Sequence, residues 1–79
     1  MRVFGYARKD EEELLEMKEV TFQATPEKLR ILAGFFEKFA NEIENGIAGK
    51  AHSHVKYECP EWNGSYPDII LYYDSDYKK

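Results

Sequence analysis

The strongest hydrophobic pattern occupies the middle of the chain, from Thr25 to Gly46. Its apolar positions recur at steps of three and four residues, as on one face of an α-helix. The main stripe comprises Leu29, Leu32, Ala33, Phe36, Ala40 and Ile43, and Phe35 and Phe39 widen it. Thr25 offers a capping hydroxyl, Pro26 lacks the N–H that a first turn leaves unpaired, and Asn45-Gly46 is a typical helix end. The pattern predicts one helix of about twenty residues that buries Phe36.

Alternating residues near the N-terminus predict a strand hairpin. Residues 2–8 alternate with the period of a strand until the acidic run 10–13 interrupts them. A second strand is predicted over residues 14–24, although its apolar residues change parity partway along, at Leu15, Met17, Val20 and Phe22. A bulge near Lys18-Glu19 would reconcile the two halves, because one extra residue turns every later side chain to the opposite face.

The signals after the helix are weaker. Residues 68–73 are apolar on both faces, which predicts a strand that is either central in a sheet or covered on its outer face by a partner. Residues 58–67 contain two prolines and a glycine and are typical of a loop, whereas residues 51–57 are compatible with a short strand. The predicted fold is α+β, with an antiparallel sheet of three to four strands in the order ββαβ or ββαββ. A single long amphipathic helix covers one face, and residues 1–79 form one domain, since so short a chain has room for one core.

Composition and charge exclude several classes of protein. The 79 residues carry 15 acidic and 11 basic side chains, a net charge of −4, whereas a nucleic-acid binder needs a basic surface. Nowhere do about 18 apolar residues run together, so no membrane span is expected. Cys59 is the only cysteine, which rules out an intramolecular disulfide and favours a cytoplasmic location.

Catalytic and metal-binding candidates are confined to three residues. His52 and His54 would share one side of a strand and Cys59 follows closely, but this spacing matches no common zinc pattern. The neighbouring Glu58 and Glu61 would raise the pKa of the Cys59 thiol and so weaken it as a nucleophile. We therefore predict no catalytic residues, no metal and no cofactor, and the protein is not expected to be an enzyme.

Two features favour protein binding. Half of the twelve aromatic residues fall in the last 23 positions, and Tyr and Trp are common in recognition surfaces. The residues are Tyr57, Trp62, Tyr66, Tyr72, Tyr73 and Tyr77. Glu42 and Glu44 lie in the last helical turn, where the helix dipole disfavours acids, and could form an acidic face together with residues 10–13. Each feature also has a purely structural interpretation. The aromatic residues would pack on the sheet edge and the helix ends, and the acids would be scattered and solvated.

Several short motifs follow one another in a distinctive order: Glu19-Val20-Thr21-Phe22, Ala24-Thr25-Pro26-Glu27-Lys28-Leu29, Glu42-Ile43-Glu44-Asn45-Gly46, His52-Ser53-His54, Trp62 and Pro67-Asp68-Ile69-Ile70. This order resembles a family of small bacterial immunity proteins from polymorphic toxin systems, the family named immunity protein thirty-two. The resemblance implies a cytosolic protein that binds a cognate toxin from its own strain and blocks it without turnover. In that family acidic residues tend to follow the second histidine, whereas Val55-Lys56 follow it here.

The leading hypothesis is a small cytoplasmic binding protein whose partner is a basic toxin domain. The predicted partner-binding residues are Glu11, Glu12, Glu42, His52, His54, Trp62, Tyr66 and Asp68. One alternative is a structural homo-oligomer, such as a homodimer, that pairs through residues 68–73. Another is a small metal- or thiol-dependent enzyme that uses His52, His54 and Cys59.

Overall fold

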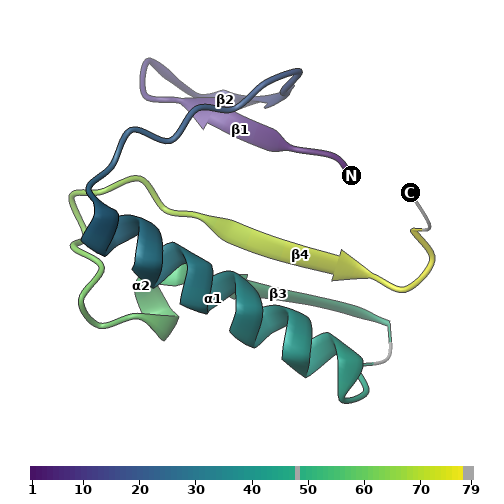
Figure 1. The fold of residues 1–79 in the computed structure, drawn as a ribbon. Helices are drawn as coiled ribbons and strands as arrows, with labels where there is room; N and C mark the ends of the chain where they lie inside the picture. Colours follow the sequence, from purple (N-terminus) through teal and green to yellow (C-terminus); the bar gives the residue numbers. More distant parts are fainter. Residues whose placement is uncertain (48, 78–79) are drawn as a thin grey trace.

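A computed structural model describes residues 1–47 and 49–77 and confirms the α+β class. In chain order the elements are β1 (Phe4–Ala7), β2 (Asp10–Glu16), α1 (Pro26–Glu44), β3 (Lys50–His54), α2 (Val55–Glu58) and β4 (Ile70–Asp74). Figure 1 shows α1 crossing the β3–β4 sheet and the β1–β2 hairpin set apart from both.

The strands form two separate antiparallel sheets, β1–β2 and β3–β4, so the predicted sheet of three to four strands is not observed in the described residues. The connection from β2 to α1, residues 17–25, has no regular secondary structure and leads the chain away from the hairpin. Within the described chain, no backbone hydrogen bond joins the hairpin to β3 or β4. The alternating N-terminal residues therefore form a hairpin that does not join the β3–β4 sheet.

The hairpin differs from its prediction in register and length. The acidic run 10–13, expected to interrupt the strands, lies inside β2, and the chain turns at Arg8 and Lys9. The irregular register lies in β1, between Gly5 and Ala7, and the predicted bulge near Lys18 is absent because residues 17–25 are not a strand. Every residue of β2 is exposed, so four consecutive acids can occupy a strand without losing their hydration.

Helix α1 begins and ends where local chemistry predicts. The Thr25 hydroxyl accepts a hydrogen bond from the backbone N–H of Lys28 at 3.3 Å, and Pro26 occupies the first turn. Asn45 caps the other end, and Gly46 follows with φ at 112°, a left-handed conformation that glycine adopts without steric cost.

The buried face of α1 is one step away from the predicted one. Phe35 is 3% exposed and Leu32 and Phe39 are also buried, whereas Phe36 is 43% exposed, so the placement of Phe36 in the core was wrong. Residues 32, 35 and 39 satisfy the same three- and four-residue spacing as the predicted stripe. A two-stranded sheet is too narrow to cover the whole apolar surface of the helix, and Leu29 and Phe36 remain outside.

The core lies between α1 and one face of the β3–β4 sheet. Directly opposed residues of an antiparallel pair share a face, so Ser53 and its partner Leu71 point toward α1. The core cluster comprises Leu32, Phe35, Val55 and Trp62, with Ile31, Cys59, Tyr66, Ile69 and Leu71 packed against it. Val55 is 0% exposed and opens α2, a single helical turn in place of the end of the predicted strand 51–57.

Candidate partner-binding surface

The face of the β3–β4 sheet opposite α1 carries imidazole, phenol and aliphatic side chains. We call it the open sheet face and define it by His52, His54, Tyr57, Ile70 and Tyr72. The strand register places His52 opposite Tyr72 and His54 opposite Ile70. Tyr72 is 62% exposed, and Tyr57, which lies in α2, is 73% exposed. This surface unites two predicted binding residues with two tyrosines of the aromatic-rich C-terminal region.

Asp68 fixes the orientation of one imidazole on this face. Its Oδ2 lies 2.6 Å from Nδ1 of His54, and both side chains are partly buried. The Lys56 ammonium lies 3.9 Å from the same carboxylate oxygen. A carboxylate on Nδ1 selects the tautomer that leaves Nε2 for other partners, and no described residue hydrogen-bonds Nε2. His54 is thus oriented by its own chain for contact with a partner.

The rings on the open sheet face form a continuous row. The His52 and His54 rings lie edge to face at 5.3 Å, and the Tyr57 ring lies 5.1 Å from that of His54. The Lys56 ammonium sits 5.2 Å from the centre of the Tyr57 ring. Rings held against one another lose little conformational entropy on binding, which suits recognition of another protein.

The arrangement does not support the thiol or metal alternatives. Ser53 points to the α1 side of the sheet, and Cys59 packs against the core on that side, away from the two histidines. In the part of the chain that the structure describes, no group of three or more His, Cys, Asp or Glu side chains is placed to hold a metal ion. The histidines and the cysteine, which the sequence placed close together, are separated by the sheet.

Trp62 and Tyr66, two of the predicted partner-binding residues, pack on the α1 side of the β3–β4 sheet and not on the open sheet face. Trp62 is 7% exposed, and its indole N–H donates a hydrogen bond to the Pro67 carbonyl at 3.0 Å. The Tyr66 ring packs edge to face on it at 5.3 Å. Because Pro67 directly precedes Asp68, this hydrogen bond holds the loop that delivers the carboxylate to His54. The sequence revealed the aromatic clustering but not which rings face inward.

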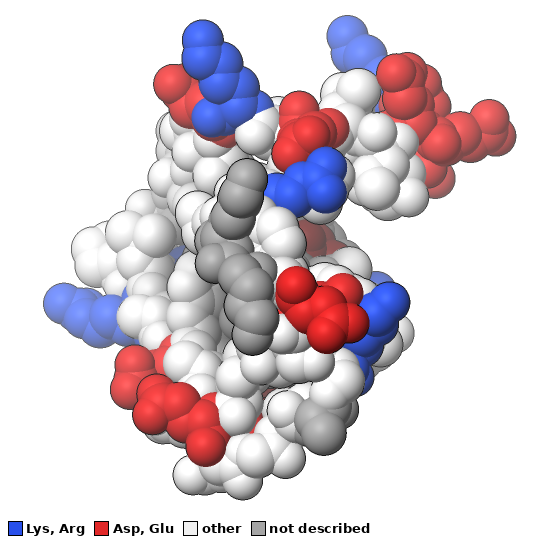
Figure 2. All heavy atoms as spheres, turned by 90° about the vertical axis from the view of Figure 1, so that its right-hand side faces the viewer, with Lys and Arg blue, Asp and Glu red and all other residues white. Residues whose placement is uncertain are grey.

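The predicted acidic residues occupy separate places. Glu11 and Glu12 are in β2, at the top of Figure 1, whereas Glu42 is in the last turn of α1, at the bottom of that view, with β4 between them. Figure 2 shows acidic side chains in several groups, interrupted by basic and uncharged surface, on the face it presents. These acids do not join His52, His54 and Asp68 in one patch.

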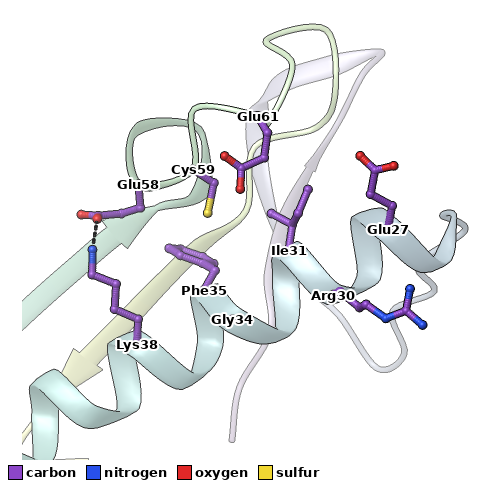
Figure 3. A pocket seen from close by; sticks show the side chains of 9 residues that line it. All are labelled: Glu27, Arg30, Ile31, Gly34, Phe35, Lys38, Glu58, Cys59 and Glu61. Atoms are coloured by element: carbon purple, nitrogen blue, oxygen red, sulfur yellow. Dashed lines mark hydrogen bonds and ion pairs between the residues drawn. The ribbon is translucent and has the colours of Figure 1, made fainter.

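A groove of about 700 Å³ lies between α1 and the turn that contains α2 (Figure 3). Its lining residues are Glu27, Arg30, Ile31, Gly34, Phe35, Lys38, Glu58, Cys59 and Glu61. Gly34 stands inside α1, although glycine in a helix interior costs about 0.5–1 kcal/mol relative to alanine. Gly34 is therefore a sign of the groove in the sequence, and the hydrophobic period of the helix does not reveal it.

Charged groups at the groove perturb one another. The Lys38 ammonium lies 2.7 Å from Glu58, and this hydrogen bond raises the pKa of Lys38 and lowers the pKa of Glu58. Partial burial raises the pKa of the Cys59 thiol, and Glu61 and Glu58 raise it further. The effect of the two glutamates agrees with the sequence-based expectation, but burial is the larger cause. Cys59 is therefore a neutral thiol in the groove wall at ordinary pH.

Comparison with known proteins gives a family. The family model described as Immunity protein 32 matches residues 19–74. Neither a curated protein nor a solved structure shows a significant match. Among the described residues, no helix combines the length and the apolar character that crossing a bilayer requires. The matched segment contains α1, β3, α2 and β4, and on this basis the chain belongs to the Immunity protein 32 family.

Proposed function

We propose that this protein is a cytoplasmic immunity protein that binds a cognate toxin in a one-to-one complex and blocks it without catalysing a reaction. Membership of the Immunity protein 32 family supports a protein partner. The open sheet face carries the proposal, because it combines two exposed tyrosines with a histidine that Asp68 holds in place.

The open sheet face has the composition of an interface centre. Tyr72 and Tyr57 offer large rings with hydroxyl groups, and such residues are frequent among the side chains that dominate binding energy. His54 is oriented before binding, so less entropy is lost when it contacts the toxin. Asp68 and Trp62 act as positioning residues, the first on the imidazole and the second on the loop before Asp68.

The acidic residues contribute at longer range in this proposal. The net charge of −4, to which Glu11, Glu12 and Glu42 belong, favours encounter with a basic toxin. Scattered charges outside an interface mainly affect the association rate and its dependence on salt. Replacement of these three acids by glutamine should slow association at low salt and leave the dissociation rate nearly unchanged.

The experiment is co-expression with the toxin domain encoded beside this gene. We expect rescue of growth and a one-to-one complex by native mass spectrometry. Tyr72→Ala and His54→Ala should each weaken binding by about 2 kcal/mol, roughly thirtyfold in Kd. Tyr6→Ala removes another exposed tyrosine, on the hairpin, and is the matched control. Unchanged affinity in folded Tyr72→Ala and His54→Ala variants would refute the open sheet face as the interface.

The outer surface of α1 favours a homodimer as a second candidate. Leu29 and Phe36 are seven positions apart and therefore lie on one side of the helix, and both are exposed. Exposed large apolar side chains on one face often mark an interface. Light scattering over a concentration series of wild type and Phe36→Ser separates the two cases, because a dimer through this surface gives a mass that doubles with concentration only in the wild type.

A further inference from the structure

We propose that the groove between α1 and α2 receives a cationic side chain of the partner protein, an arginine or a lysine. The proposal rests on the proposed function only for the source of that side chain, which is the toxin. The groove is separate from the open sheet face, because it lies on the α1 side of the β3–β4 sheet.

Gly34 is the first observation. A Cβ atom built on it would find no atom within 4 Å, so the packing of the chain itself does not require glycine here. Its φ is not positive, and the helix backbone does not require glycine either. Glycine nevertheless destabilises a helix interior relative to alanine. The absent side chain leaves the space beside Gly34 free for a side chain of the partner.

The distribution of charge identifies the occupant. Figure 3 shows Glu27 and Glu61 extending on the same side of α1, with Ile31 between them, whereas the Arg30 side chain extends away. No described residue forms an ion pair with either carboxylate. Lys38, the other cation of the lining, is already paired with Glu58 at 2.7 Å. Two acids that have no ion-pair partner among the described residues therefore line the groove.

The floor between these acids is apolar. Ile31 and the buried Phe35 provide carbon surface, and the Cys59 thiol adds an uncharged atom. An arginine or lysine would place its methylene groups on this floor and its charge between Glu27 and Glu61. An acidic side chain would be repelled, and an apolar one would remove water from the carboxylates without replacing their hydrogen bonds.

The first test uses the intact protein and N-acetyl-arginine amide, followed by NMR at the Gly34 amide and the Ile31 methyl groups. N-acetyl-citrulline amide is the matched uncharged probe. We expect saturable shifts with the arginine probe and at least about tenfold weaker binding of the citrulline probe, a difference of ~1.4 kcal/mol. Equal responses to both probes, or no response to the arginine probe, would overturn the proposal.

Variants then assign the site and the partner. Gly34→Leu should fill the groove and abolish the shifts, Glu61→Gln should weaken them, and Asn41→Leu, on the same helix outside the groove, should leave them unchanged. Gly34→Leu should also weaken binding of the toxin, and full toxin affinity in that variant would overturn the proposal. If His54→Ala and Tyr72→Ala bind the toxin normally, the open sheet face fails, and the response to the arginine probe still decides the groove.

Discussion

The β1–β2 hairpin and the β3–β4 sheet are both two-stranded and antiparallel, yet only one of them has a core. Helix α1 packs on β3–β4, and the core beside it contains Val55 and Trp62. Every residue of β2 is exposed, and the hairpin contributes no residue to the core cluster. A two-stranded hairpin alone is marginally stable in water, so the covering helix is what makes β3–β4 the more stable of the two sheets. The family match likewise begins at Glu19, after the hairpin.

The hairpin is held by contacts at its surface. The Arg2 guanidinium makes two hydrogen bonds to Glu16, at 2.9 and 3.2 Å, and lies 4.7 Å from the centre of the Phe4 ring. The backbone N–H of Met17 donates to the Val3 carbonyl at 2.7 Å and extends the ladder. Exposed ion pairs stabilise little, so these contacts order the hairpin without adding much to the free energy of unfolding.

The largest expected effect tests which side chains form the core. Phe35→Ala should cost about 3–5 kcal/mol, because it leaves a cavity beneath α1, and this is as much as a domain of this size has. The variant should be largely unfolded by circular dichroism at room temperature. Phe36→Ala and Phe4→Ala remove the same ring from exposed positions, in α1 and the hairpin, and urea denaturation should show losses below about 1 kcal/mol. A Phe36→Ala variant as unstable as Phe35→Ala would contradict the observed helix face.

The second largest effect concerns the N-terminal cap of α1, where the part of the chain that forms the core begins. Thr25→Ala removes the side-chain acceptor for the Lys28 N–H and should cost about 1 kcal/mol of unfolding free energy. Thr25→Ser keeps the hydroxyl and should lose only a few tenths of that. Thermal unfolding of both variants measures the cap, and equal melting temperatures would mean that it contributes nothing.

The ends of α1 could be predicted because the residues that set them are neighbours in sequence. Thr25, Pro26 and Gly46 act through the local backbone, and the structure has them in those roles. The buried face could not be chosen, because the stripes through Phe35 and Phe36 fit the helical period equally well. The buried face depends on which strands pack against α1. The sequence predicted a sheet of three to four strands under the helix, whereas only β3 and β4 lie there.

The candidate site was likewise predicted only in part, because its contacts depend on the tertiary structure. His54 and Asp68 were both candidates, but their hydrogen bond depends on the β3–β4 register, which brings residues 14 positions apart together. Trp62 was a candidate for partner binding with inward packing as the alternative, and the sequence could not decide between them because aromatic composition carries no information on the direction of a side chain. The groove was missed because its walls come from α1 and from the turn after β3, and Gly34 was the only local sign of it.

A smaller effect is expected in the reactivity of cysteine thiols, which differs between the groove wall and the exposed hairpin. In the wild type the raised pKa of Cys59 keeps the thiol protonated, so alkylation by iodoacetamide at neutral pH should be slower than for a free peptide thiol. A cysteine introduced by Glu13→Cys in a Cys59→Ser background reports on the exposed hairpin and should react at the rate of the free peptide. Because the folded pKa is raised, stability from Cys59 is present below its ordinary pKa and is lost as the pH rises through the folded value. Equal alkylation rates for the two cysteines would show that the groove wall opens as readily as the hairpin.

The smallest expected effect is also the most direct test of the comparison. Removal of residues 1–18 deletes the whole hairpin but no residue of the core cluster, so the free energy of unfolding should change by less than about 0.5 kcal/mol. Urea denaturation of the shortened chain should remain a single cooperative transition, with a lower m-value because less surface becomes exposed. Loss of the transition would mean that the hairpin supports α1 or β4 by contacts stronger than those observed. With stability retained, faster dissociation of the toxin would instead assign the exposed hairpin side chains to binding, because the loss of Glu11 and Glu12 as long-range charges is expected to change only the association rate.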